Sequence, residues 1–264
     1  MLALIGLIGL AGCASGSGPA PSDATTGTTA GPTVATVRPA PGDQTVKFIA
    51  DGSERSYRIH APASYGPGIA MPVVLVFHGS PGSPDEIHDQ SKMDDVADTH
   101  GFLVVYPDHF SDTESVVALL DHLVPTWNVD QKRIYAAGFS RGGSLVYRIA
   151  QQLSARLAAV APVSAVGATG VALERPISLI TFQGGRDSLS VGFQQTNAAW
   201  AMSAQCGQAQ DQTITMEGGP TYISSSTCAG GAEHVIYSVA RMAHIWPIDA
   251  STLVWDFFSR HPLP

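Results

Sequence analysis

The sequence predicts an α/β fold in which a mostly parallel, twisted sheet carries helices on both faces. Short, continuously apolar runs such as 72–77 and 102–106 are typical of strands that are buried on both faces. These runs alternate along the chain with segments of helical periodicity. Short loops join the two kinds of segment, and such alternation produces parallel strands with helical crossovers. In sheets of this kind, ligands bind at the carboxyl ends of the strands.

The folded part is expected to open with a β-hairpin over residues 45–60, with its turn at Asp51-Gly52. The capping box Ser83-Pro84-Asp85-Glu86 predicts a helix that starts there and continues to about His100. A second capping signal at residues 111–114 predicts a helix through Leu123. The other expected elements are strands at 72–77, 102–106, 133–138, 158–164, 177–182 and 235–239, and helices at 144–150, 191–204 and 251–260.

Length and charge limit the classes of function. The 264 residues are enough for one sizeable core, which we expect to span residues 44–264. With 14 Lys and Arg against 22 Asp and Glu, the formal net charge is −8, which argues against nucleic acid as a partner. The nine histidines are scattered without metal-ligand spacing, so we expect no metal.

The amino-terminal segment has a composition of its own. Residues 1–13 form an apolar run, too short to span a bilayer, that ends in Leu10-Ala11-Gly12-Cys13. This ending looks like a bacterial lipobox, in which a signal peptide is cleaved before the cysteine and the thiol is acylated. Residues 14–43 are rich in Ser, Gly, Pro and Thr and predict a flexible tether. We therefore expect the protein to lie outside the cytoplasm, anchored through Cys13 or secreted. A buried apolar strand or helix is the alternative for residues 1–13.

The sequence Gly138-Phe139-Ser140-Arg141-Gly142 lies between an expected strand and an expected helix. A serine in such a turn exposes its hydroxyl only in a strained backbone conformation, and glycines two residues away on either side prevent a clash. The helix that follows points free N–H groups to where negative charge develops during acyl transfer. Ser140 is therefore the candidate nucleophile. An ordinary Gly-rich turn is the alternative.

Two further candidates follow strands. Asp187 comes after the strand at 177–182 and His244 after the strand at 235–239. The chain order Ser, Asp, His, with each residue at a strand end, predicts a catalytic triad. His244 would take the proton of Ser140 and pass it to the leaving alcohol, and Asp187 would hold the imidazole. The alternatives are an aspartate bonded to its own turn and a histidine on the surface or in the core.

Residues beside these candidates are expected to shape the site. The backbone N–H groups of Ser80 and Arg141 are the expected oxyanion donors, because Pro81 has none. We expect His78 to orient its loop. The Arg141 side chain either attracts acidic substrates at the pocket rim or is solvated. Trp246 is a candidate aromatic wall for the substrate, with packing in the core as an equal alternative.

Cys206 and Cys228 remain once Cys13 is assigned to the anchor. Two leftover cysteines in an exported protein usually pair, and two free thiols are the alternative. The disulfide would close a loop of about twenty residues and stabilise the fold by about 3 kcal/mol. We expect it to steady the segment that carries His244.

Residues 45–262 resemble the secreted polyhydroxybutyrate depolymerase and feruloyl esterase family of α/β-hydrolases. The resemblance rests on residues 57–62, His78-Gly79, Tyr106-Pro107, residues 133–143, the Asp187 loop, the cysteine pair and His244-Ile245-Trp246-Pro247. It implies a carboxylic ester hydrolase without a cofactor, with Ser140, Asp187 and His244 as its triad.

The chain departs from that family at two places. Only Asp108-His109-Phe110 separate Pro107 from the next helix cap, so a wall of the acyl pocket is expected to be missing. Arg141 stands where relatives often carry a small or amide-bearing residue. Both departures bear on the substrate and leave the triad intact.

The 47 positions from Ser140 to Asp187 leave no room for a large lid domain, so we expect an open crevice. The sequence thus predicts an extracytoplasmic serine esterase that forms an acyl-enzyme. Feruloyl, acetyl or short hydroxyacyl esters, small or attached to a polymer, are the expected substrates. The alternatives are a serine peptidase on the same fold and a non-catalytic surface lipoprotein that binds an envelope ligand.

Overall fold

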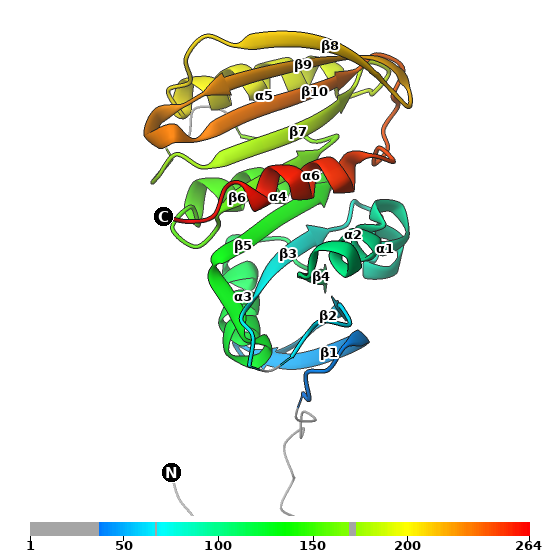
Figure 1. Ribbon diagram of the computed structural model, residues 1–264, viewed down its shortest axis with the longest axis vertical. Coiled ribbons are helices and arrows are strands. Elements are labelled where there is room, and N and C mark those ends of the chain that lie inside the picture. The colour runs from blue at the N-terminus through cyan, green and yellow to red at the C-terminus, as the bar shows by residue number, and fades with distance from the viewer. Residues whose placement is uncertain (1–36, 67, 169–172) are drawn as a thin grey trace, which may run out of the picture. The chain divides into compact units, whose positions relative to one another are not determined.

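The protein is described here by a computed structural model that covers residues 37–66, 68–168 and 173–264, all within one compact unit. A ten-stranded sheet runs through this unit in the order β1-β2-β4-β3-β5-β6-β7-β10-β9-β8 (Figure 1). Its strands are β1 (Gly42–Ala50), β2 (Ser53–Ala61), β3 (Met71–Phe77), β4 (Leu103–Asp108), β5 (Val129–Phe139), β6 (Ala159–Val163), β7 (Ser178–Gly184), β8 (Gln210–Met216), β9 (Gly219–Thr227) and β10 (Glu233–Val239).

The centre of the sheet is parallel and its two ends are antiparallel. Strands β4, β3, β5, β6, β7 and β10 pair in parallel, and helical crossovers join β3 to β4, β4 to β5 and β5 to β6. The hairpin β1–β2 adds to β4 at one end, and β9 and β8 add to β10 at the other. The predicted mostly parallel sheet is therefore confirmed, and the carboxyl ends of its central strands share one edge.

Six α-helices cover both faces of the sheet in the described residues. They are α1 (Pro84–Ser91), α2 (Met93–His100), α3 (Thr113–Trp127), α4 (Arg141–Gln152), α5 (Ser190–Ser203) and α6 (Ala250–Ser259), with one turn of 3₁₀ helix, η1, at Ala229–Gly231. Side chains of α3, α4 and α5 join one buried apolar cluster, and those of α1, α2 and α6 join the other. Strand β3 contributes side chains to both clusters. Val73 and Leu75 belong to the first cluster, and Val74 and Val76 belong to the second.

The expected helix at 84–100 is wrong in one respect, because the structure divides it. Ser83 caps α1 by accepting a hydrogen bond from the Glu86 N–H, as the capping box predicts. Lys92 then takes a left-handed conformation with φ 50°, which ends α1 and redirects the chain into α2. The redirection places Ile87 of α1 and Met93 of α2 in the same buried cluster.

Helix α3 also differs in detail from its expected bounds. It is capped by Asp112, whose carboxylate accepts the Ser115 N–H at 2.8 Å. It runs past Leu123 to Trp127, which is fully buried and donates its indole N–H to the Tyr57 hydroxyl at 3.0 Å. This bond ties the helix to β2. The helix ends at Asn128, which takes a left-handed conformation with φ 49° and donates its N–H to the Val124 carbonyl oxygen.

Strands β8 and β9 were not expected at all. Every residue of β8 except Met216 is exposed, so its sequence lacks the alternation of apolar residues that predicts a half-buried strand. Pairing with β9, whose Ile223 is buried, holds β8 in the sheet.

Residues 1–36 lie outside the described residues. The expected signal segment at 1–13, the acylated Cys13 and most of the tether at 14–43 therefore stay predictions, although β1 begins at Gly42, slightly before the expected boundary. In the described part of the chain, none of the helices has the length and hydropathy that crossing a bilayer requires.

Candidate active site

Ser140 occupies a tight turn at the centre of the sheet's carboxyl edge. Strand β5 ends at Phe139 and α4 begins at Arg141, so that Ser140 alone connects them, with φ 54° and ψ −117°. A Cβ added at Gly138 would lie 2.6 Å from the Gly142 carbonyl carbon, and one added at Gly142 would lie 2.3 Å from the Phe77 carbonyl oxygen. The two glycines are thus required by contact, because α4 returns directly over the end of β5.

His244 and Asp187 reach Ser140 from neighbouring strands. Strands β7 and β10 pair in parallel up to Gly184 and Val239, so the loops that leave them lie side by side. The Ser140 hydroxyl lies 2.8 Å from Nε2 of His244, and the Nδ1 of His244 lies 2.8 Å from Oδ2 of Asp187. The structure therefore brings the three predicted residues into one chain of hydrogen bonds.

The environments of the two partners differ. Asp187 is 3% exposed, and its second oxygen accepts the Leu189 N–H at 2.9 Å. His244 is partly open to solvent, and its ring packs against the Phe139 ring with 4.9 Å between centroids. The carboxylate is thus fixed inside the protein while the imidazole faces the side from which a substrate enters.

Two glycines that the sequence analysis passed over hold these loops together. A Cβ at Gly184 would lie 2.2 Å from the Met242 carbonyl oxygen, and one at Gly185 would lie 2.5 Å from the Ala240 carbonyl oxygen. The N–H groups of Gly185 and Arg186 donate to the carbonyls of Val239 and Met242. The Gly-Gly pair two residues before Asp187 was the available signal, because such a pair permits close approach of another backbone.

The loop of the expected donor Ser80 and the start of α4 both lie beside Ser140. A Cβ at Gly79 would lie 3.4 Å from the Cβ of Ser140, so the loop that carries Ser80 packs against the nucleophile. His78 Nδ1 lies 2.7 Å from the Gly79 carbonyl oxygen, within the same loop. Arg141 is the first residue of α4, and its N–H has no acceptor inside the helix.

Two pockets adjoin Ser140, and both include the loop of residues 78–82 in their walls. The first, about 200 Å³, is lined by Ser140, Phe139 and His244 and by Glu86, Ile87 and Gln90 of α1. The second, about 490 Å³, is lined by residues 109–111 and by Arg141, Ser144, Leu145 and Arg148 of α4. The short loop after β4 therefore forms a wall of the second pocket. The expectation that a wall of the acyl pocket is missing stays a prediction.

Of the two roles expected for Trp246, the structure supports packing in the core, and the side chain lines neither pocket. It is 6% exposed, lies in the apolar cluster under α6 and donates its indole N–H to the Ser251 hydroxyl at 3.1 Å. Packing against the sheet turns the ring inward, although the residue is only two positions from His244.

The predicted disulfide between Cys206 and Cys228 is present. Its expected effect on the His244 segment stays a prediction, and the strand register argues against it, because Thr227, beside Cys228, pairs with Glu233 at the start of β10. His244 follows the opposite end of that strand, so the disulfide fastens α5 to the hairpin β8–β9 away from the candidate site.

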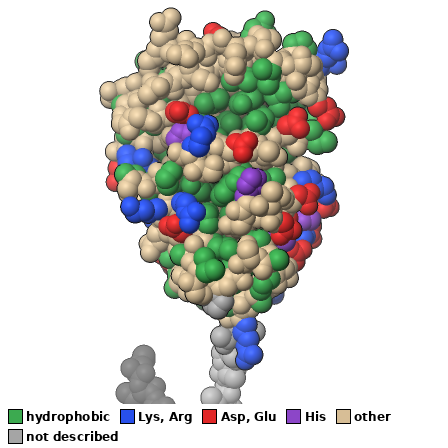
Figure 2. Space-filling view, viewed as in Figure 1, with side chains coloured by type: hydrophobic (Ala, Val, Ile, Leu, Met, Phe, Trp, Pro, Cys, Tyr) green, Lys and Arg blue, Asp and Glu red, His purple; other side chains and the backbone are tan. Residues whose placement is uncertain are grey.

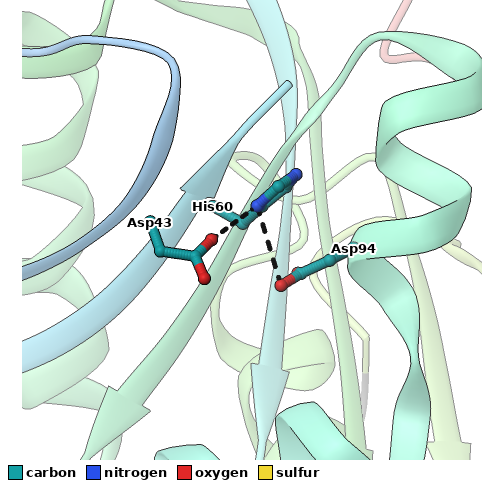
Figure 3. Close-up of side chains that lie close together, drawn as sticks. All are labelled: Asp43, His60 and Asp94. Carbon is teal, nitrogen blue, oxygen red and sulfur yellow. Dashed lines mark hydrogen bonds and ion pairs between the residues drawn. The ribbon is translucent and has the colours of Figure 1, made fainter. Parts of the chain in front are cut away.

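A cluster of His and Asp side chains lies between β1, β2 and the helix α2. The Nδ1 of His60 lies 2.6 Å from Oδ1 of Asp43 and 3.7 Å from Oδ2 of Asp94 (Figure 3). The Nε2 of His60 lies 3.1 Å from Oδ1 of Asp98. The ligand-type atoms of Asp43, His60 and Asp94 are close enough to one another to surround a metal ion. Spacing along the chain gave no sign of this cluster, since the sheet brings its members together.

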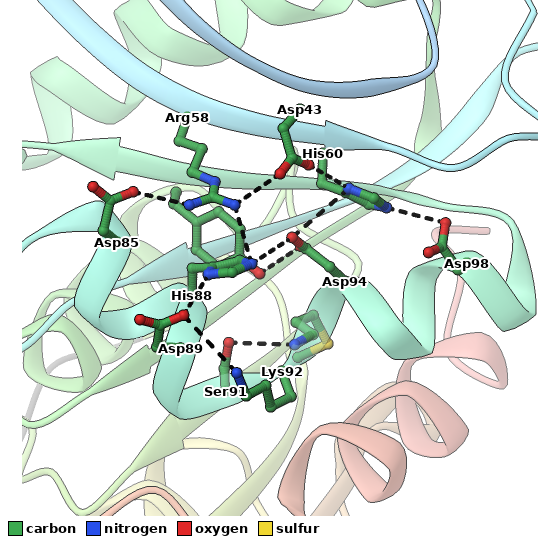
Figure 4. Close-up of polar contacts among 12 residues, drawn as sticks. Asp43, Arg58, His60, Asp85, His88, Asp89, Ser91, Lys92, Asp94 and Asp98 are labelled. Atoms are coloured by element: carbon green, nitrogen blue, oxygen red, sulfur yellow. Dashed lines mark hydrogen bonds and ion pairs between the residues drawn. The ribbon is translucent and has the colours of Figure 1, made fainter.

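Cationic groups of the protein already compensate these carboxylates. Arg58 donates to Asp43 at 2.8 Å and to Asp85 at 2.9 Å, and its Nη2 lies 3.1 Å from the ring of His88 (Figure 4). Burial lowers the pKa of His60, but its hydrogen bond to Asp43 and the nearby Asp94 and Asp98 outweigh this and raise it. We therefore interpret the cluster as an ion-pair network that fastens β1 and β2 to α1 and α2.

A third pocket, of about 420 Å³, shares no residue with the two at Ser140. Both polar and apolar side chains line it, from β8, β9, β10 and α6, among them Gln212, Ser225, Val235 and Phe257. Hydrophobic side chains gather in the upper part of the face shown in Figure 2, the part of the view in which Figure 1 draws β8, β9 and β10. The pocket has no part in the geometry around Ser140.

The order of the central strands, the helices on both faces and the turn at Ser140 define the α/β-hydrolase fold. The acetyl xylan esterase of Aspergillus awamori superposes with a TM-score of 0.66 over 83% of this chain and 99% of its own, at 13% sequence identity. At that level of identity, the likeness shows the fold.

Comparison by sequence finds no family model that matches the chain. It is 30% identical over 156 residues to a bifunctional acetylxylan esterase/xylanase of Neocallimastix patriciarum. It is also 30% identical over 165 residues to NocK of Nocardia uniformis subsp. tsuyamanensis, which is named provisionally as an esterase. Each match includes 54% of this chain, and they span 23% and 48% of the two relatives, respectively.

Proposed function

We propose that the protein is a serine carboxylic ester hydrolase that works through an acyl-enzyme. The observation that carries the proposal is the continuous path of hydrogen bonds from Ser140 through His244 to the buried Asp187. This arrangement can remove a proton from the hydroxyl and hold the resulting imidazolium beside a carboxylate. The esterase names of two relatives and of the superposed structure agree with it.

The proposed reaction has two halves, formation of the acyl-enzyme and its hydrolysis, and Ser140, His244 and the oxyanion donors act in both. The Ser140 oxygen attacks the ester carbonyl carbon while its proton passes to Nε2 of His244, and the carbonyl oxygen becomes an oxyanion. Backbone N–H groups of Ser80 and Arg141 would donate to that oxyanion. When the carbon–oxygen bond to the alcohol breaks, the alcohol takes the proton from His244. Water then repeats these steps on the acyl-enzyme and releases the acid.

The proposed substrates are acetyl, feruloyl or short hydroxyacyl esters, small or attached to a polymer. Two observations support this range. The names of a relative and of the superposed structure specify acetylxylan esterases. The pockets beside Ser140 are partly open clefts, which a substituent of a larger ester can enter. The resemblance to polyhydroxybutyrate depolymerases places hydroxyacyl esters in the same proposal. The reaction needs no cofactor.

We further propose that the enzyme works outside the cytoplasm, attached to the membrane by an acylated Cys13 or secreted. The disulfide between Cys206 and Cys228 supports an oxidising compartment. Mass spectrometry of protein extracted from membranes tests the anchor. A mature chain that starts at a diacylated Cys13 is expected, and an unmodified chain with residues 1–12 still attached would contradict it.

Hydrolysis assays on the purified chain test the proposed activity. The substrates are p-nitrophenyl acetate, butyrate and octanoate, methyl ferulate and a peptide anilide. We expect the short acyl esters to be preferred, no cleavage of the anilide, and a loss of activity in Ser140→Ala. Ser259→Ala, which removes an exposed hydroxyl from α6, is the matched control and should retain activity.

The outcomes separate the rival functions. Faster cleavage of the anilide than of the esters would favour a serine peptidase. Equal, slow hydrolysis by the wild type and Ser140→Ala would favour a non-catalytic binding protein. Slight residual activity in Ser140→Ala is compatible with an esterase, because oxyanion contacts alone accelerate hydrolysis.

A further inference from the structure

The second pocket at Ser140 has an unusual distribution of charge for so acidic a chain. Arg141 and Arg148 both line it, and both side chains are exposed. They lie seven residues apart on α4, which places them on one face of the helix, with Ser144 and Leu145 between them. His109, in the loop after β4, also lines the pocket. The part of the pocket lined by α4 is therefore cationic, although the formal net charge of the chain is −8.

The ion pairs formed by the described residues include neither of these two arginines. Arginine ion pairs in the described part of the chain involve Arg58, Arg133, Arg156 and Arg260. Arg148 donates to the neutral Ser111 carbonyl oxygen at 3.0 Å, which holds its guanidinium at the pocket wall. Neither Arg141 nor Arg148 has a carboxylate partner among the residues that the structure describes.

The same pocket also offers apolar contacts. Phe110 and Leu145 line it, and the guanidinium of Arg55 lies over the Phe110 ring at 5.7 Å, which holds the ring in place. Its volume of about 490 Å³ suits a group as large as one sugar ring or one substituted aromatic ring. The pocket begins at Arg141 and Gly142, directly after the nucleophile. A group bound there can therefore belong to an ester whose carbonyl lies at Ser140.

We propose that this pocket binds a free carboxylate carried by the ester substrate, with Arg141 and Arg148 as its binding groups and Phe110 in contact with the body of the bound group. The inference rests on the proposed esterase function and specifies its substrate as an anionic ester. The carboxylate can belong to the acyl part, as in a dicarboxylic acid monoester, or to the alcohol part, as in an acylated uronic acid. The paired cations make either substrate better than a neutral ester of the same shape.

Two matched pairs of substrates test this proposal and distinguish the two sources. One pair is p-nitrophenyl hydrogen glutarate and the corresponding glutaramide ester, which differ only in the charge of the acyl part. The other is an O-acetylated methyl glucuronoside and the matching glucoside. We expect kcat/KM to favour the anionic member of at least one pair by on the order of 3- to 10-fold in 50 mM salt. The preference should decline in 0.5 M salt, because exposed charges are screened.

Variants show which side chains cause the preference. Arg148→Gln and Arg141→Gln should each reduce the anionic-to-neutral ratio of kcat/KM, and Arg148→Lys should retain part of it. Arg156→Gln is the matched control, because it changes the net charge equally. Arg156 and its ion-pair partner Asp121 both lie outside the pocket. An equal loss in Arg156→Gln would mean that net charge alone causes the preference and would overturn the proposal.

Failure of this inference is distinct from failure of the esterase proposal. Ser140-dependent hydrolysis without preference in either pair leaves the esterase intact and overturns the carboxylate site. If no ester is hydrolysed, calorimetric titration of Ser140→Ala with the anionic and neutral glucosides decides. Tighter binding of the anionic sugar that Arg148→Gln abolishes would support the site, and equal binding of both would overturn it.

Discussion

The Ser140 hydroxyl lies 2.8 Å from Nε2 of His244, across a separation of 104 residues in the chain. Parallel strands explain this contact, because β5, β7 and β10 all end at the same edge of the sheet. Each functional loop starts where its strand stops, so residues distant in sequence meet without long connections. The predictions below test the geometry that results.

Asp187→Asn should lower kcat for p-nitrophenyl acetate by roughly 10³- to 10⁴-fold, because an amide in place of the carboxylate favours the wrong imidazole tautomer and cannot stabilise the imidazolium. Asn has nearly the same size, so the fold should be retained, which circular dichroism can check. Asp211→Asn on the exposed strand β8 is the control and should retain full activity. A decrease of less than tenfold in Asp187→Asn would remove Asp187 from the proposed triad.

Gly142→Ala should destabilise the protein by about 3 kcal/mol or more, because its new Cβ would overlap the carbonyl oxygens of Phe77 and His78. Gly66→Ala is the matched control, because a Cβ there meets no atom within 4 Å. Its stability should change by less than about 0.5 kcal/mol. Urea unfolding of both variants measures the difference, and equal midpoints would show that α4 does not pack so closely on β3.

Replacing both Cys206 and Cys228 by serine should lower the free energy of unfolding by about 3 kcal/mol, because the disulfide closes a loop with a sequence separation of 22. Activity at 25 °C should remain close to that of the wild type, since the disulfide lies at the end of β10 away from His244. Calorimetry and an esterase assay on the same sample measure both. A large loss of activity in a variant that is still folded would show that the disulfide supports the site after all.

The raised pKa of His60 predicts that stability declines at alkaline pH. The folded protein holds the proton on His60 more tightly than the unfolded chain does. The contribution of the network is therefore complete below about pH 6.5, the usual pKa of histidine, and is lost as the pH rises through the pKa of the folded state. His60→Gln should be less stable than the wild type at pH 6 and should lose less stability between pH 6.5 and 9. Parallel declines in urea unfolding would contradict this assignment.

His234 should act in the opposite direction at acidic pH. Burial lowers its pKa to about 4, so the unfolded chain binds a proton between pH 4 and 6.5 that the folded state excludes. The contribution of neutral His234 to the free energy of unfolding is therefore fully present above pH 6.5. That free energy should fall by about 3 kcal/mol as the pH decreases to 4. In urea unfolding, His234→Leu should lose less stability than the wild type between pH 6.5 and 4. An equal loss of stability in both proteins would mean that other groups cause the decline.

The sequence was sufficient to locate the parts of the site that follow strands directly. Ser140, Asp187 and His244 were singled out by their order and by the strands before them, and the structure places them in contact. The buried central strands were predictable for a related reason: a continuously apolar run is already a strong signal.

Features that depend on contacts between distant residues could not be predicted from the sequence. Strand β8 has an exposed, polar sequence and is defined by its pairing with β9. The Trp246 side chain lies in the core, where its ring packs in the apolar cluster and its indole N–H donates to the Ser251 hydroxyl. The second pocket combines a loop after β4 with Arg148 on the second turn of α4, and no local pattern associates them.

Covalent labelling tests the central claim most directly, namely that His244 and Asp187 activate the Ser140 hydroxyl as a nucleophile. The purified chain is treated with diisopropyl fluorophosphate, and the modified residue is located by tandem mass spectrometry. The account predicts one label per chain, on Ser140, with labelling strongly slowed in His244→Ala. An unlabelled Ser140, or labelling at the same rate in His244→Ala, would contradict it.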